Sequence, residues 1–247
     1  MTTLSRFLLP LILIACCAEA YASGSSLPLA SFSYTFGNGG LTSTSPGSYA
    51  GSSCGGILNT CETDTASATA NLVLQASGTG SIGWSADPSV SVGIYYELVG
   101  PANTQAQVTI TGFGSINLNV ARSGYAYSAI DAGIGSTALI CTEVVDTVCG
   151  SNAGPSPNSG PLVQALTVNS NTVYEFTLET GCNALGGTCS AYLDPSVVVT
   201  SSNASSFVVE LSPNVTTVPE PSTIAMMFAG LGLTRCAIRR KGTKRSS

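Results

Sequence analysis

The sequence has no histidine, and only 9% of its 247 residues are charged. Without an imidazole, no Ser-His-Asp or Cys-His nucleophile can form, and the commonest protein ligand for transition metals is missing. These absences remove most hydrolase mechanisms and all histidine metal sites. We expect no cofactor and no metal.

Basic residues are scarce away from the two ends of the chain. Residues 23–217 contain Arg122 as their one basic side chain against eleven carboxylates, a formal charge of −10. A surface with this charge repels the phosphate backbone of nucleic acids. The sequence therefore excludes nucleic acid as a partner.

Long apolar runs are also absent, and the first short one indicates an export signal. Arg6 precedes an apolar run over 7–18, which is too short to span a bilayer, and small residues of the A-x-A type follow. Cleavage after Ala22 assigns residues 1–22 to a signal peptide. The alternative is a lipoprotein box, Leu13-Ile14-Ala15-Cys16, with Cys16 as the acylated residue.

The last thirty residues have three parts in a fixed order. The motif over 218–223, VPEPST, is stiff and extended because of its two prolines. Residues 224–238 predict an apolar helix with Ser222 or Thr223 as its N-cap, and residues 239–247 are a basic tail. The uninterrupted apolar run is ten residues, short of the ~20 that span a bilayer. Snorkelling of Arg235 to the interface would lengthen it to about fifteen residues.

This order of motif, apolar segment and basic cluster resembles the PEP-CTERM sorting signal of Gram-negative bacteria. The motif residues are Val218, Pro219, Glu220 and Pro221. The resemblance implies an exosortase, a membrane-embedded processing enzyme, as partner. It also implies transient anchoring in the inner membrane by the C-terminal helix, then delivery to the cell surface or the exopolysaccharide matrix. The run SAYLDP over 190–195 resembles a stretch of uncharacterised β-rich proteins with this tail.

Residues 23–217 predict a single all-β domain. Alternation with a period of two recurs along this segment, and no window shows the apolar stripe of a helix. The clearest strand candidates are 29–36, 68–76, 90–99, 105–112, 115–120, 125–131, 162–168, 172–180, 197–200 and 207–211. Clusters of Gly, Ser, Asn and Pro predict turns at 37–56, 77–80, 100–103, 150–161 and 184–187. We expect an antiparallel β-sandwich, with a jelly roll as one form of it, followed by the C-terminal hydrophobic helix.

Six cysteines remain between the two terminal signals. They lie in close pairs: Cys54 and Cys61, Cys141 and Cys149, Cys182 and Cys189. An even number of cysteines in an exported protein predicts disulfides. Fifteen pairings are possible, and pairing within each close pair is the simplest. Zinc is the rival, disfavoured because histidine and C-x-x-C are absent.

Carboxylates are the remaining candidates for catalysis. Glu175 and Glu179 would lie about 13 Å apart along a strand, farther than the carboxylates of glycosidases. The closer pairs are Glu62 with Asp64 and Glu143 with Asp146, which flank the presumed disulfide loops. We expect both pairs to be solvated charge and the protein not to be an enzyme.

The sequence Asp-Pro-Ser-Val occurs twice, at 87–90 and 194–197. Because Asp-Pro starts turns and proline suits the first position of a strand, we expect two strand-entry turns. Calcium binding by Asp87 and Asp194 is the alternative.

Aromatic residues offer a candidate binding surface. Trp84, Tyr125 and Tyr127 are candidate glycan-stacking residues, and the two tyrosines share one face of a strand. The competing interpretation is that these rings fill the core or cover the faces of the sheets. The sequence favours an exported, non-enzymatic protein of the cell surface or exopolysaccharide matrix. The alternative is a lectin-like, carbohydrate-binding module with the same sorting signal and an exopolysaccharide as ligand.

Overall fold

The computed structural model describes residues 26–36, 39–55, 60–133, 137–144, 149 and 158–215. These residues form antiparallel strands and a short 3-10 helix, η1 (Ala204–Ser206). The strands are β1 (Ser31–Phe36), β2 (Gly39–Ser43), β3 (Gly47–Gly55), β4 (Thr60–Ala68), β5 (Leu74–Ala86), β6 (Ser89–Val99), β7 (Gln105–Asp131), β8 (Thr137–Val144), β9 (Ser159–Asn169), β10 (Val173–Val199) and β11 (Val208–Leu211). The predicted all-β, antiparallel fold is confirmed. The signal peptide, the sorting motif, the C-terminal helix and the basic tail lie outside the described residues.

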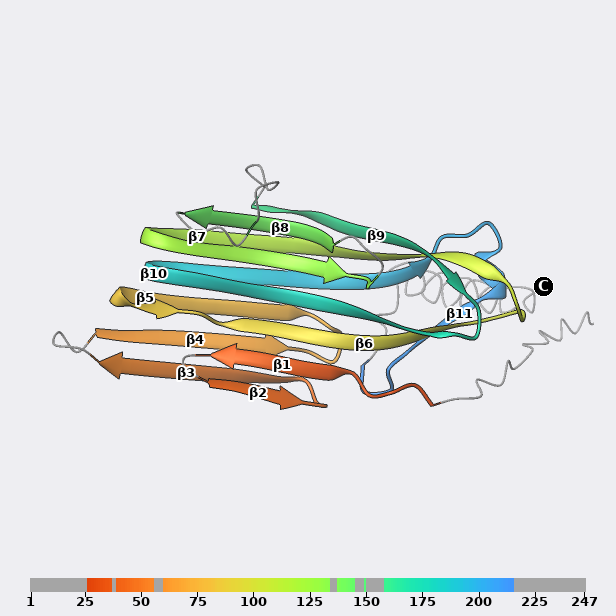
Figure 1. Cartoon of the computed structure of the whole chain (residues 1–247), viewed down its shortest axis with the longest axis horizontal. Helices are drawn as coiled ribbons and strands as arrows, with labels where there is room; N and C mark the ends of the chain where they lie inside the picture. The colour runs from red at the N-terminus through yellow and green to blue at the C-terminus, as the bar shows by residue number, and fades with distance from the viewer. Residues whose placement is uncertain are drawn as a thin grey trace, which may run out of the picture.

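The strands form one continuous hydrogen-bonded network that is folded over on itself. Its main path has the strand order β2-β1-β6-β10-β5-β4-β3. Off this path, β7 pairs with β10, β8 and β9, and β11 pairs with β6. Figure 1 shows β7 and β10 turning back at one end of the molecule, where β5 also leads into β6. The two halves of β7, and likewise those of β10, therefore belong to two different layers.

Glycines and a disulfide mark the corner in β10. The Cα atoms of Cys182 and Cys189 are 5.8 Å apart, whereas seven residues of extended strand would separate them by about 23 Å. The pairing register with β7 and β5 shifts between Leu185 and Gly187, and Gly186 has a φ of +71°. The turn predicted at 184–187 is confirmed as this corner.

We name the two layers after their central strands. The β6 layer runs β2-β1-β6, then residues 173–185 of β10, residues 123–131 of β7, and β8. The β5 layer runs β3-β4-β5, then residues 187–199 of β10, residues 105–120 of β7, and β9. The layers face each other as in a sandwich closed at its corners.

The core fills the space between the layers with alternate residues of each strand. In β10, Phe176 and Leu178 are buried while Glu175 is exposed, as the alternation over 172–180 predicts. Tyr34 of β1 and Tyr49 of β3 meet across the layers with ring centroids 4.6 Å apart. The inward residues are therefore mostly apolar, and the outward ones are mainly small and polar.

Several predicted turns are strands instead. Residues 37–56 contain β2 and β3, and residues 77–80 belong to β5. The strands β4 and β8 were not predicted, and the predicted strand over 68–76 contains a turn in which Leu72 has a φ of +65°. Clusters of glycine and serine predicted turns here, but pairing with neighbouring strands holds these segments extended and overrides the low strand propensity of glycine.

The two Asp-Pro sequences differ in their structure. Asp87 and Pro88 lie between β5 and β6, as a strand-entry turn should. Asp194 and Pro195 lie inside β10, opposite Phe113 and Gly112 of β7. The second strand-entry turn was therefore a wrong prediction, because pairing with β7 continues through it.

Candidate functional site

The predicted tyrosine pair lies on the outer face of the β6 layer and is held by carboxylates. The rings of Tyr125 and Tyr127 have centroids 6.1 Å apart. The Tyr125 hydroxyl donates to Asp87 Oδ1 at 2.9 Å, and the Tyr127 hydroxyl donates to Glu179 Oε1 at 2.6 Å. Burial, and then the hydrogen bond to Glu179, raises the pKa of Tyr127 well above its ordinary value of 10.0. Trp84 belongs to β5, and its side chain lies outside the described part of the chain.

The outer face of the β6 layer is acidic. Glu175 and Glu179 lie on the same side of β10, and Asp131 of β7 lies opposite Thr177, between them. The carboxylate of Glu175 occupies the space above Gly93, where a Cβ would lie 3.0 Å from its Oε1. We call the outer surface of Asp131, Glu175 and Glu179 the acidic face.

Glu62 and Asp64 are buried, which corrects the expectation that they are solvated. Their exposed fractions are 3% and 1%. Cys61, Thr63 and Thr65 point outward from β4, so the alternation of the strand turns the two carboxylates inward. Burial, and then the charges of Asp64 and Asp87, raises the pKa of Glu62 above its ordinary value.

Glu143, a carboxylate of the second candidate pair for catalysis, has a structural contact. Glu143 Oε2 accepts a hydrogen bond of 2.9 Å from the backbone N–H of Cys149, beside the Cys141–Cys149 disulfide. Its predicted partner Asp146 lies outside the described residues. Within the described ranges, His, Cys, Asp and Glu side chains form no group of three that would hold a metal ion.

The cysteines join within each close pair. Disulfides link Cys54 to Cys61, Cys141 to Cys149, and Cys182 to Cys189. Cys54 and Cys61 are opposite residues of β3 and β4 with Cα atoms 4.1 Å apart. This is the local pairing that the sequence spacing favoured.

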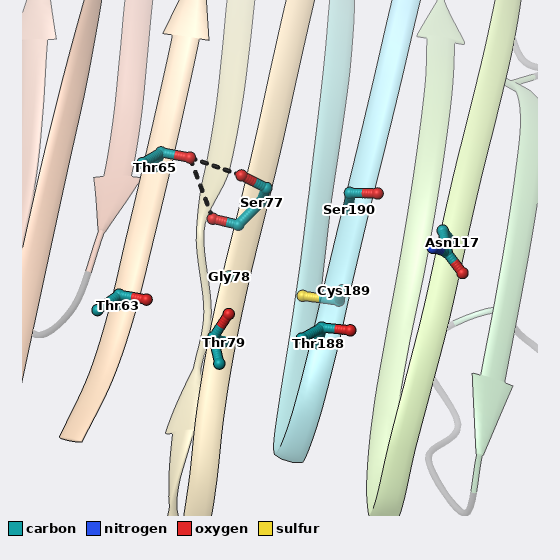
Figure 2. A pocket seen from close by; sticks show the side chains of 9 residues that line it. All are labelled: Thr63, Thr65, Ser77, Gly78, Thr79, Asn117, Thr188, Cys189 and Ser190. Atoms are coloured by element: carbon teal, nitrogen blue, oxygen red, sulfur yellow. Dashed lines mark hydrogen bonds between the residues drawn. The ribbon is translucent and has the colours of Figure 1, made fainter.

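The outer face of the β5 layer is covered with hydroxyl and amide groups. We call this surface the hydroxyl face, made by Thr63, Thr65, Ser77, Thr79, Asn117, Thr188 and Ser190. These residues come from β4, β5, β7 and β10, and they surround a shallow depression of about 310 Å³ (Figure 2). The Thr65 and Ser77 hydroxyl oxygens are 2.6 Å apart and hydrogen-bonded.

Sequence reasoning missed the hydroxyl face. The available signal was the repetition of small polar residues at every second position, as in Thr63 and Thr65, Ser77 and Thr79, and Thr188 and Ser190. These pairs lie in three segments that are far apart in the chain. Only the strand register brings them into one surface.

The comparisons with known proteins give little information about the body. A search of curated proteins finds no match. A carbohydrate-binding module, TmCBM61 in complex with β-1,4-galactotriose, is 6% identical with a TM-score of 0.25, covering 51% of this chain and 70% of that one. The enzymatically active domain of bacteriophage CBA120 tailspike protein 4 is 11% identical with a TM-score of 0.23, covering 69% of this chain and 19% of that one. Similarities this weak support no inference about the body, and its resemblance to uncharacterised β-rich proteins stays a prediction.

The C-terminal segment gives a definite match. In the described residues, no helix is long and apolar enough to cross a membrane, and the predicted C-terminal helix is not among those residues. Residues 217–241 match the PEP-CTERM protein-sorting motif family. These matched residues include Val218, Pro219, Glu220 and Pro221, on which the resemblance rested. The chain is a PEP-CTERM-containing protein, exported and sorted through an exosortase.

Proposed function

We propose that this chain is a non-enzymatic protein of the bacterial cell surface or exopolysaccharide matrix. In this proposal, residues 224–238 hold it in the inner membrane until an exosortase processes the motif at 218–221. The observation that carries the proposal is the match of residues 217–241 to the PEP-CTERM sorting motif. The basic tail after the apolar segment supports an orientation with its C-terminus in the cytoplasm.

The body has features that suit a protein outside the cytoplasm. Three disulfides lie in a domain of fewer than 200 residues, and such bonds persist in oxidising compartments. Its formal charge of −10 favours solubility and hydration.

Contacts of the carboxylates support a non-enzymatic role. Asp87 and Glu179 accept hydrogen bonds from Tyr125 and Tyr127, and Glu143 accepts one from the backbone beside a disulfide. Each of these carboxylates therefore has a structural partner. A general acid or base would instead need to face a substrate.

The proposal is tested by changing the two motif prolines in the native host. The variant Pro219→Ala/Pro221→Ala should accumulate in the inner-membrane fraction, because the stiff motif that the exosortase recognises is lost. The measurement is immunodetection of the protein in inner-membrane, cell-surface and matrix fractions.

The matched control is Pro161→Ala, which changes an exposed proline of β9 outside the motif. It should be distributed like the wild type. A double variant that still reaches the surface or matrix in wild-type amounts contradicts the proposal.

A second candidate function is a carbohydrate-binding module with the same sorting signal. One observation favours it, the uncharged hydroxyl face with its shallow depression. The aromatic residues named from the sequence favour it less, because the hydroxyls of Tyr125 and Tyr127 are hydrogen-bonded to the carboxylates of Asp87 and Glu179.

A further inference from the structure

The two outer faces of the sandwich differ in charge. The acidic face on the β6 layer carries Asp131, Glu175 and Glu179. In the part of the chain that the structure describes, Asp194 is the one carboxylate on the outer face of the β5 layer. A ligand that avoids negative charge would therefore meet the protein at the hydroxyl face.

The hydroxyl face is ordered in rows that cross the strands. The strand register aligns Ser52, Thr63, Thr79, Thr188 and Asn119 in one row, and Ala50, Thr65, Ser77, Ser190 and Asn117 in the next. Neighbouring strands are ~4.8 Å apart, and neighbouring rows are separated by two residues, or ~6.6 Å. Apart from Ala50, the result is a repeating array of side chains that both donate and accept hydrogen bonds.

Side chains of the array are open to a ligand. Thr63, Thr79, Asn117 and Thr188 are exposed, and they line the depression together with the bonded pair Thr65 and Ser77 (Figure 2). The volume of about 310 Å³ is at the lower end of the range for ligand sites in proteins. It would accommodate a few sugar units of a longer chain rather than enclose a small molecule.

Two aromatic rings continue this surface along β10 and β7. Tyr192 lies opposite Gln75 and Ser115 in the row after Ser190, and Phe113 lies opposite Asp194 in the row beyond. The Tyr192 side chain is hydrogen-bonded to Asp194, and the Phe113 side chain is 53% exposed. The exposed ring of Phe113 and the half-buried ring of Tyr192 offer apolar surface for the CH faces of sugars beside hydrogen-bonding groups.

We propose that the hydroxyl face, with Tyr192 and Phe113 at its border, binds an extended, neutral polysaccharide chain. Sugar hydroxyls would exchange hydrogen bonds with the threonine, serine and asparagine side chains in the depression. Tyr192 and Phe113 would contact the faces of sugar rings beyond it. The lack of charge in the two rows and the charge of −10 on the body both disfavour a polyanionic polysaccharide. This inference does not depend on the sorting route, because binding is a property of the purified protein.

Isothermal titration of the purified full-length protein tests the inference. The probes are soluble dextran, glucomannan and xyloglucan, with alginate as the polyanionic comparison. We expect at least one neutral polysaccharide to bind, and alginate to bind at least ten-fold more weakly. No detectable binding of any of the three neutral polysaccharides, or tighter binding of alginate than of the neutral polysaccharides, overturns the proposal.

Substitutions locate the site. Thr79→Glu places a charge in the centre of the first row and should weaken binding at least ten-fold. Thr79→Val removes only the hydroxyl while keeping a branched side chain that suits a strand, and it should weaken binding several-fold. Tyr192→Ala should also weaken binding several-fold by removing a ring.

The matched controls are Ser33→Glu on the exposed face of β1 in the β6 layer and Thr167→Val at the far end of β9. Both should bind like the wild type, and thermal unfolding checks that every variant is folded. Wild-type affinity in folded Thr79→Glu, or equal losses in Ser33→Glu, would overturn the assignment to the hydroxyl face. If no polysaccharide binds, the expected fractionation of the Pro219→Ala/Pro221→Ala variant does not change. The binding proposal and the sorting proposal are therefore tested separately.

Discussion

Glu62 is a carboxyl group enclosed by the fold next to other acids. Burial, and then the charges of Asp64 and Asp87, raises its pKa above the ordinary value of 4.5. A raised pKa means that the folded state holds the proton more tightly than the unfolded chain. The free energy of unfolding therefore falls as the pH rises from 4.5 through the raised pKa.

We predict that Glu62→Gln removes this loss of stability. The melting temperature of the variant minus that of the wild type should increase between about pH 4 and about pH 7, because only the wild type acquires a buried charge. Each kcal/mol corresponds to a shift of roughly 2–4 °C for a domain of this size. Thermal unfolding followed by circular dichroism measures the difference.

The control for Glu62 is Glu175→Gln, which changes an exposed carboxylate of β10. Its melting temperature should stay close to that of the wild type at each pH, since surface substitutions change stability by about 0.5 kcal/mol or less. A difference between Glu62→Gln and wild type that is constant with pH would show that the Glu62 charge does not oppose folding.

At the scale of elements, the corner of β10 joins the two layers. Gly186 has a φ of +71°, a region that favours glycine, and a Cβ on Gly187 would overlap the carbonyl oxygen of Asn119. The Cys182–Cys189 disulfide closes this corner, with both cysteines buried. The Cys54–Cys61 disulfide closes a hairpin of the same sequence separation, 7, with both cysteines exposed.

We predict that removing these two disulfides has unequal effects. Because the closed loops have equal length, the chain-entropy contribution of about 2–3 kcal/mol is the same for both. Cys182→Ala/Cys189→Ala also loses buried sulfur atoms from the core, at a further cost of about 1 kcal/mol or more. Its free energy of unfolding in urea should therefore fall below that of Cys54→Ala/Cys61→Ala. Equal losses, or a larger loss for the exposed pair, would contradict a packing role for the corner disulfide.

Strong alternation of apolar and polar residues made some strands predictable. The strand β6 and the first residues of β10 place a branched or aromatic side chain inward at every second position, and β9 does so except at Gln164. By contrast, β2 and β3 consist largely of glycine, serine and other small residues. These two strands are extended because they pair with β1 and β4, not because their own sequences alternate. The sequence pattern therefore predicted a turn for this segment.

The hydroxyl face was unpredictable for a related reason. Thr79 and Thr188 are neighbours only because β5 and β10 pair in one register, and a shift of one residue would turn the hydroxyls inward. The corner glycines, by contrast, lay in a predicted turn. The inward direction of Glu62 could have been read from the outward Cys61, Thr63 and Thr65, had β4 been recognised as a strand.

On the scale of the whole molecule, the body separates an acidic face from an uncharged one. Asp131, Glu175 and Glu179 lie on the β6 layer, and the rows around Thr79 lie on the β5 layer. At a crowded cell surface, this arrangement would keep one face hydrated and repelled by other anions. The uncharged face would then be the one available for contact with neutral polymers.

The intact mass of the mature protein from its native host tests export, processing and disulfide formation together. We predict a chain that begins at Ser23 and lacks the basic tail, because the signal peptide and the sorting segment are both removed. Its mass should be about 6 Da below that of the same chain with free thiols, since three disulfides lack six hydrogens. Reduction followed by alkylation should then add six equal increments. A lipid-modified mass that begins at Cys16 would replace the signal-peptide assignment, and a chain that keeps residues 218–247 would contradict processing at the motif.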